Sequence, residues 1–247
     1  MPWFTRYIPL SLPRSWMRDV VHFGMKAHVM GGSRELNLAP IAAVRRTRKP
    51  PISWSAIMVK AIALTAQRWP QLRQSYLPYP WPHIYQHPYG VATIVVEREW
   101  QGEHAVFFGH IPAAETMSLR EIEHRVRMFK TAPIESIEDY RLIIGNARLP
   151  LPLRRLLWWF ALTWSGRMRS SYFGTYAINA IPVRGTEVIQ SSTPVAIVFY
   201  HGPVEPNGDT SVQIFFDHRV WDGRTVQRMG NDLETTINRD IAAELLH

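Results

Sequence analysis

A stretch near the C-terminus, residues 214–223, contains the residues best suited to chemistry. An apolar, strand-like run carries His218 into a turn, Asp222 follows four residues later, and Gly223 closes the turn. A histidine has an unperturbed pKa of about 6.5, so a histidine held by its neighbours can take a proton from a hydroxyl or thiol at neutral pH. The pairing of His with Asp at this spacing is common by chance. On its own it predicts a general base and no particular reaction.

The complete string Asp217-His218-Arg219-Val220-Trp221-Asp222-Gly223 is more specific. It closely resembles the signature of the catalytic domain of the 2-oxo acid dehydrogenase acyltransferases, and chloramphenicol acetyltransferase carries the same His-x-x-x-Asp-Gly. The resemblance implies that His218 is a general base, which deprotonates an acceptor that then attacks an acyl-CoA thioester. It also implies that Asp222 fixes the turn by pairing with an arginine and does not carry protons.

Two arginines are candidates for that structural partner, because a buried carboxylate is costly unless it is paired. Arg14 and Arg18 lie just before the first expected strand, where the family keeps its arginine, and Arg18 ranks slightly higher. The alternative is that Asp222 is an ordinary turn residue, as Asp-Gly often is.

A second informative stretch is Phe173–Ala180, which is followed by the apolar run Val195–Val198. Its order and spacing resemble a strand, a loop and a strand of the same family. The family places a serine that stabilises the tetrahedral oxyanion where this chain has Asn179. An asparagine amide can also donate to an oxyanion, and losing one such donor costs about 10²–10³ in rate. The resemblance therefore implies a catalytic Asn179, with Thr175 as a substrate-binding residue; the alternative is a structural asparagine at the strand end.

The resemblance extends from about Arg14 to the C-terminus and implies a fold. We expect an α/β (α+β) two-layer sandwich of the chloramphenicol acetyltransferase type, in which helices pack on a mixed sheet. A length of 247 residues suits one large α/β unit, so residues 1–247 are expected to form a single acyltransferase catalytic domain without a lipoyl domain. The family builds its site between subunits, which implies a homotrimer or a larger assembly of trimers in which His218 and Asn179 of different chains meet.

Hydrophobic periodicity and capping residues predict the individual elements. A strand is expected at His22–Val29 and a helix at Trp54–Trp69 with Ser53 or Ser55 as N-cap. Ser118 and Glu121 form a capping box before a helix over Leu119–Lys130. Further expected elements are a short helix from Asn37, a hairpin of Gly90–Glu97 and His104–Gly109, helices within Tyr140–Arg169, a hairpin of Val195–Tyr200 and Val212–Phe216, and a helix over Arg224–Leu246.

The segment Leu153–Trp164 combines arginines with tryptophans. Such a pattern is typical of a buried helix or a subunit interface, with arginines whose stems lie along apolar surface. It is also typical of a helix that lies on a membrane or contacts a lipid substrate. Both interpretations stay open at this point.

Composition restricts the partners. The chain has no cysteine, which excludes disulfides, thiolate metal sites and a cysteine nucleophile. His83 and His87 have the spacing of helical metal ligands, but Pro82 and Pro88 argue against a helix there, so no metal is expected. Lys and Arg total 28 against 20 Asp and Glu, and this net charge of +8 favours an anionic partner.

We therefore expect no bound cofactor and a coenzyme A thioester as co-substrate; an acyl carrier protein or a lipoyl domain supplied in trans would also suit the charge. No nucleic-acid motif accompanies the basic residues. The N-terminus lacks the pattern of a secretory signal, and the longest apolar run, Leu156–Trp164, is shorter than the roughly 20 residues that span a bilayer, so a cytoplasmic location is expected. The rival interpretations are a noncatalytic trimeric scaffold and a membrane- or lipid-binding protein that kept the acyltransferase fold.

Overall fold

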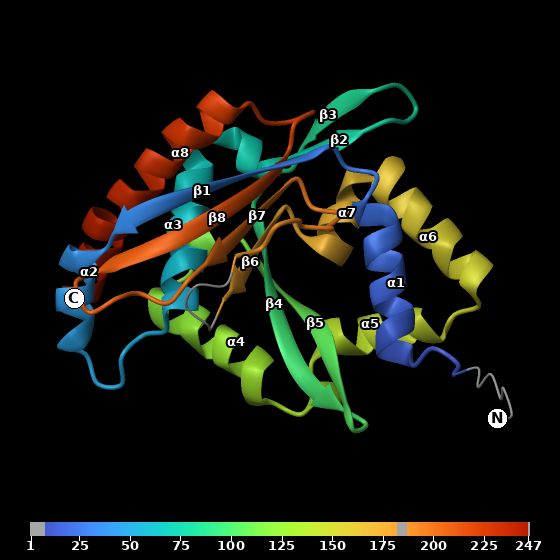
Figure 1. The fold of residues 1–247 in the computed structure, drawn as a ribbon, viewed down its shortest axis with the longest axis horizontal. Helices are drawn as coiled ribbons and strands as arrows, with labels where there is room; N and C mark the ends of the chain where they lie inside the picture. Colours follow the sequence, from blue (N-terminus) through green and yellow to red (C-terminus); the bar gives the residue numbers. More distant parts are fainter. Residues whose placement is uncertain (1–7, 182–186, 247) are drawn as a thin grey trace, which may run out of the picture.

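A six-stranded mixed sheet forms the centre of the computed structural model, which describes residues 8–181 and 187–246 (Figure 1). The strand order is β1 (Val29–Asn37), β8 (Asp209–Asp217), β7 (Ile197–His201), β6 (Tyr176–Ala180), β4 (Val91–Trp100) and β5 (Glu103–Pro112). A separate hairpin consists of β2 (Gln74–Leu77) and β3 (His83–Gln86). The predicted mixed sheet packed by helices is confirmed.

Strand direction places the end of β8 beside the beginnings of its neighbours. β6 runs parallel to β4 and β7, whereas β7 and β8 are antiparallel. The amide of Asp217, the last residue of β8, accordingly donates to the carbonyl of Ala196, just before β7, at 2.8 Å. His218 therefore follows β8 at the end of the sheet where β6 and β7 begin.

Helices cover both faces of the sheet. On one face lie α3 (Trp54–Arg68), α4 (Leu119–Thr131) and α8 (Gly223–Thr235), and α8 continues through a π-helical turn (Thr236–Ile241) into α9 (Ala242–Leu246). α2 (Ala39–Arg46) packs against the same C-terminal segment. On the opposite face, α1 (Leu12–Gly24) and α7 (Gly166–Phe173) contact the β4–β5 hairpin, and α5 (Glu138–Arg148) and α6 (Leu151–Thr163) flank them (Figure 1).

The helix starts follow the predicted capping residues. Ser53 accepts a hydrogen bond from the amide of Ala56 at the start of α3, and Ser118 and Glu121 form both bonds of the capping box at the start of α4. The Asn207-Gly208 turn joins β7 to β8, with Gly208 at φ +95°. A side chain at Gly208 would also meet the backbone of Ala39, so glycine is required there.

The strand expected at His22–Val29 was wrong over most of its length. α1 extends to Gly24, and β1 begins only at Val29. Trp16, Val20 and Phe23 recur at helical spacing and are all buried, and Ser11 caps the helix by accepting a bond from the amide of Arg14. This longer helical pattern outweighs the loose alternation that favoured a strand.

Candidate active site

His218 is the first residue after β8 and begins a hydrogen-bonded turn. The amides of Val220 and Trp221 both donate to the carbonyl of Asp217, at 2.9 and 3.0 Å, and the His218 amide donates to the carbonyl of His28 at 2.9 Å. The backbone on either side of the imidazole is thereby fixed, while its side chain is exposed.

The imidazole also has a defined tautomer. Its Nδ1 lies 2.7 Å from the carbonyl oxygen of Trp221. Because a carbonyl oxygen can only accept a hydrogen bond, Nδ1 carries the proton in the neutral ring. The lone pair therefore resides on Nε2, which is the state that a general base requires.

A buried ion pair holds the turn from the other side. Asp217 is fully buried, and its carboxylate accepts from the backbone amide of Arg219 at 3.0 Å and from the guanidinium of Arg219 at 2.6–3.2 Å. The guanidinium in turn lies over the ring of Tyr76, 4.3 Å from its centroid. The residues that flank His218 are thus locked to each other and to β2.

Arg169 of α7 joins three segments behind this turn. Its guanidinium donates to the carbonyls of Tyr76 at 2.8 Å and Pro194 at 2.7 Å. Burial lowers the pKa of Arg169 to about 10, and the charge of Asp217 opposes that shift. Arg169 therefore remains a cation at neutral pH and adds to the positive charge around Asp217.

Asp222 does not have the expected arginine partner. It is exposed and forms the N-cap position of α8, where its carbonyl accepts from the amide of Val226 at 3.0 Å. Arg14 instead pairs with Glu103 at 3.0 Å, and Arg18 lies 3.6 Å from Asp19. The predicted pairing of either arginine with Asp222 is wrong within the described chain.

Asp19 is a buried carboxylate of the kind that requires a cationic partner. It is completely buried and contacts the guanidinium of Arg154 on α6, and Arg155 also lies within 3.6 Å. The α1 arginines lie beside this carboxylate and beside Glu103, whereas Asp222 is in solvent at a helix N-terminus, where the backbone dipoles favour a negative charge.

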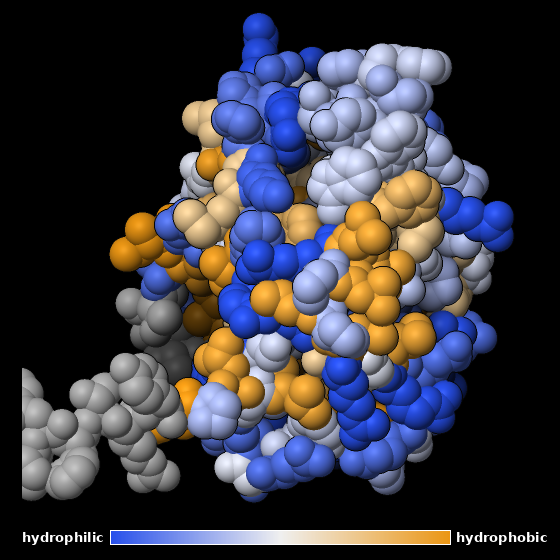
Figure 2. All heavy atoms as spheres, turned by 90° about the vertical axis from the view of Figure 1, so that its right-hand side faces the viewer, coloured by the Kyte–Doolittle hydropathy of each residue, from blue (hydrophilic) through white to orange (hydrophobic). Residues whose placement is uncertain are grey.

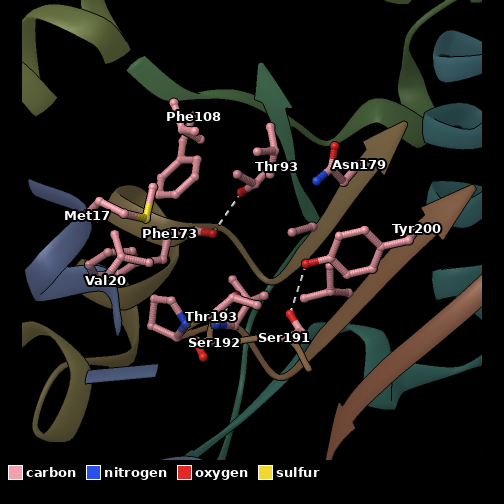
Figure 3. Close-up of a pocket in the computed structure, with 16 residues that line it drawn as sticks. Met17, Val20, Thr93, Phe108, Phe173, Asn179, Ser191, Ser192, Thr193 and Tyr200 are labelled. Carbon is pink, nitrogen blue, oxygen red and sulfur yellow. Dashed lines mark hydrogen bonds between the residues drawn. The ribbon is translucent and has the colours of Figure 1, made fainter. Parts of the chain in front are cut away.

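Asn179 lines a mostly apolar cavity of about 130 Å³ between the sheet, α1 and α7 (Figure 3). Its neighbours in the cavity wall include Thr93 of β4, Tyr200 of β7 and the loop Ser191–Val195. The hydroxyls of Tyr200 and Ser191 lie 3.0 Å apart, and burial raises the pKa of Tyr200. Apolar side chains form the rest of the lining: Met17, Val20, Val95, Val106, Phe108, Phe173, Ala177, Val195 and Val198.

Within residues 8–181 and 187–246, the side-chain amide of Asn179 makes no hydrogen bond. The residue is only half-buried. Its amide protons are therefore available to a ligand that enters the cavity.

Thr175 does not have the position of a substrate-binding residue. It is completely buried, and its hydroxyl accepts from the amide of Val91 at 3.0 Å and lies 3.3 Å from the carbonyl of the same residue. Both interactions fix the entry of the chain into β6 next to β4. The expectation that Thr175 binds substrate was wrong, because the hydroxyl is used inside the fold.

One chain does not bring His218 and Asn179 together. Across the sheet, Asn179 is in register with Tyr200, and Tyr200 with Gln213, which precedes His218 by five residues. At about 3.3 Å per residue along a strand and about 4.8 Å between strands, the two Cα atoms are roughly 19 Å apart. His218 is at the end of the sheet where β6 begins, and Asn179 is near the end where β6 finishes.

The residues that position His218 were largely missed by sequence reasoning. Arg219 lies inside the recognised string, so its pairing with Asp217 had a local signal. Tyr76 and Arg169 belong to no motif, and they reach the turn only through tertiary packing. The same holds for Tyr200, which lines the cavity beside Asn179. Among the described residues, no three His, Asp or Glu side chains gather in a way that would hold a metal ion.

Comparison with solved structures shows which fold this is. The chain is similar to the dihydrolipoamide acetyltransferase of Azotobacter vinelandii, with a TM-score of 0.70 and 13% identity over 98% of this chain and 94% of that one. The same values relate it to the cubic core of a pyruvate dehydrogenase multienzyme complex. Its similarity to chloramphenicol acetyltransferase has a TM-score of 0.53 at 11% identity, over 92% and 98% of the chains.

No family model matches the chain, and no curated protein matches it by sequence. The fold is that of the dihydrolipoamide acetyltransferase catalytic core and of chloramphenicol acetyltransferase. The resemblance noticed in the seven-residue string is thereby confirmed at the level of the fold.

Proposed function

We propose that the protein is an acyltransferase that moves an acyl group from a thioester, with coenzyme A as the carrier, to a hydroxyl, thiol or amine acceptor. The observation that carries the proposal is the state of His218. Its Nδ1 proton is donated to the Trp221 carbonyl, and its Nε2 lone pair faces solvent in a turn that is fixed on both sides.

The proposed reaction needs only this base and an oxyanion donor. Nε2 of His218 takes the acceptor's proton while the acceptor attacks the thioester carbonyl, which forms a tetrahedral oxyanion. An amide N–H of Asn179 donates to that oxyanion. The intermediate then expels the thiolate, and the proton on His218 passes to the leaving sulfur, so no covalent acyl-enzyme is required.

The separation of roughly 19 Å within one chain supports a site shared between copies. We infer that His218 of one chain meets Asn179 of another in a homotrimer, alone or within a larger assembly such as the cubic core named for one structural neighbour. A cavity of about 150 Å³ lies beside the beginning of β1. Its lining includes the apolar Met25, Ala27, Val29, Ile189 and Phe215 and the polar Gln190, Ser191 and Ser192. Ile189 is 95% exposed in the single chain, as expected for a residue that another subunit covers.

Two further features support the choice of substrate. The cavity beside Asn179 is mostly apolar and suits a short acyl chain, whereas a charged group would lose its hydration there. The net charge of +8 favours the phosphates of coenzyme A. The structural neighbour from Azotobacter vinelandii was studied for the catalytic roles of a serine, a histidine and an asparagine four residues after that histidine, the spacing of His218 and Asp222 here.

The test measures thiol release from a panel of acyl-CoAs with hydroxyl, amine and dithiol acceptors. We expect turnover by the wild-type protein and a loss of at least about 10²-fold in His218→Ala. His124→Ala, which changes an exposed histidine on α4, is the control and should retain activity. If an intact wild-type assembly used neither acyl-CoAs, an acyl carrier protein nor an acylated lipoyl domain, the noncatalytic scaffold would replace this proposal.

A further inference from the structure

α6 presents apolar side chains to solvent along one of its sides. Leu153, Leu156, Phe160 and Trp164, the residue that follows the helix, recur at intervals of three or four residues and so lie on a common side. The loop between β2 and β3 extends this surface with Tyr79 and Trp81. These six residues, each 41–66% exposed, are called the α6 face below.

The loop and the helix form one continuous surface. The ring of Tyr79 stacks on Trp164 with centroids 5.3 Å apart and an interplanar angle of 9°, and it also contacts Trp159 at 5.7 Å. The amide of Tyr79 donates to the carbonyl of Thr163 at 3.3 Å. Figure 2 shows the molecule from the right-hand side of Figure 1, the side on which α6 lies. Hydrophobic residues (orange) gather near the middle of this surface, with hydrophilic residues (blue) around them.

The fold does not use this face for its own packing. The inner side of α6 is anchored by Trp158, whose ring contacts Trp16 at 4.7 Å and Phe173 at 4.8 Å, and by the buried pair of Arg154 with Asp19. The outer side chains contribute little to the core, yet they are large and apolar. A group of large apolar side chains exposed together usually marks an interaction site.

The two segments that form the face carry charge of a single sign. Residues 140–186 include seven arginines and no aspartate or glutamate, and residues 36–96, which contain the β2–β3 loop, also lack acidic residues. Arg167 on α7 is exposed, whereas Arg155 on α6 lies 3.6 Å from the buried Asp19. An occupant of the α6 face therefore meets apolar and cationic groups but no carboxylate from these segments.

We propose that the α6 face docks on an anionic lipid bilayer. Leucine and phenylalanine would enter the boundary between headgroups and acyl chains, tryptophan and tyrosine would lie at headgroup depth, and Arg167 would contact lipid phosphates. Within the described residues no helix is long and apolar enough to cross a bilayer, so the contact is peripheral.

A second copy of the chain bound across a two-fold axis fits the face less well. A two-fold contact would repeat the same surface on both partners, and it would bring together two segments that carry arginines and no carboxylates. Such like-charge contacts are costly in a desolvated interface. An anionic bilayer instead supplies both the apolar interior and the negative charge.

The experiment is flotation of the purified protein with vesicles of phosphatidylcholine alone or with about 30% phosphatidylglycerol added. This anionic fraction gives the vesicles a strong negative surface potential. We expect binding to the anionic vesicles that weakens with added salt. Leu156→Gln combined with Phe160→Gln should reduce binding at least tenfold. Arg167→Gln should reduce it about fivefold at low salt.

Matched controls are Leu246→Gln, a leucine as exposed as Leu156 but on α9, and Arg120→Gln, an exposed arginine on α4. Both should bind like the wild type. Absence of wild-type binding to anionic vesicles would overturn the proposal, as would equal loss in the controls. Dissociation of the assembly by the Leu156/Phe160 double variant, seen by analytical ultracentrifugation, would also overturn it and assign the face to a subunit contact.

Discussion

The Nδ1 atom of His218 donates its proton to the carbonyl oxygen of Trp221, 2.7 Å away and three residues later in the chain. The turn thus selects the tautomer of the imidazole with a backbone group. No other side chain is needed to select the tautomer. The protonation state of His218 is therefore independent of Asp222, which was expected to fix the turn. Asp222 is exposed at the N-cap position of α8, where its side chain makes no capping hydrogen bond. Among residues 8–181 and 187–246, no carboxylate pairs with the imidazole.

We predict that Asn179→Ala lowers kcat by about 10²–10³, because an oxyanion would lose one hydrogen-bond donor. Asn179→Ser should retain more activity than Asn179→Ala, since a hydroxyl can donate to the same oxygen. Steady-state kinetics with acyl-CoA measure both. Equal activity of Asn179→Ala and wild type would show that Asn179 is only a structural residue of β6.

A site shared between subunits predicts complementation of two inactive variants. His218→Ala and Asn179→Ala chains, mixed in equal amounts and reassembled, should recover about a quarter of the wild-type activity, because a quarter of the sites in a cyclic assembly pair an intact histidine with an intact asparagine. If both residues acted within one chain, no chain in the mixture would contain both, and activity would stay at the level of the separate variants.

Removal of the cation beside Asp217 should destabilise the fold. Arg219→Gln leaves a buried carboxylate without its guanidinium, and we expect a loss of roughly 2–4 kcal/mol in the free energy of unfolding. Arg224→Gln, on the exposed first turn of α8, should change it by less than about 0.5 kcal/mol. Urea denaturation compares the two, and similar values would mean that Arg169 alone compensates Asp217.

The reassignment of the buried carboxylate gives a contrasting pair of variants. Asp19→Asn removes the charge that Arg154, Arg18 and Arg155 surround, and it should cost about 3–5 kcal/mol. Asp222→Asn should cost no more than about 1 kcal/mol, the value of a favourable charge at a helix N-terminus. An Asp222→Asn variant as unstable as Asp19→Asn would restore the predicted arginine partnership.

Two buried histidines predict how stability depends on pH. Burial lowers the pKa of His87 and of His201 to about 4, below the value of about 6.5 in an unfolded chain. Between pH 6.5 and 4 the unfolded chain binds more protons, so stability is fully present above about pH 6.5 and decreases as the pH falls. In that pH range, each histidine lowers the free energy of unfolding by up to about 1.4 kcal/mol per pH unit as the pH falls.

Urea denaturation at pH 7.5 and 5 measures this loss. His201→Gln should reduce the difference between the two pH values, because one titrating group is removed, whereas His104→Gln changes an exposed histidine and should leave it unaltered. An unchanged difference in His201→Gln would contradict the assignment.

Local signals accounted for the elements whose boundaries depend on neighbouring residues. The start of α4 follows from Ser118 and Glu121 alone, and the His218 turn lies within seven consecutive residues. The error at His22–Val29 arose because the burial of Trp16 and Phe23 against Trp158 of α6 stabilises the longer helix. Periodicity over a few residues does not contain that information.

The site residues divide in the same way. Arg219 pairs with a carboxylate two residues away, but Arg154 reaches Asp19 across 135 residues of sequence, so the partner of an acidic residue in α1 could not be read from spacing. The role of Thr175 was misjudged because its hydroxyl accepts a hydrogen bond from the amide of Val91 in β4. Only the strand order reveals that neighbour.

The distance between His218 and Asn179 has a consequence for when the protein becomes active. Under the proposed mechanism, a chain that has folded but not yet assembled holds a competent base and an oxyanion donor that never face each other. Such a newly made monomer would be inactive, and its incomplete active site would not hydrolyse acyl-CoA. Specific activity would then fall on dilution below the dissociation constant of the assembly, with the fold of each chain unchanged.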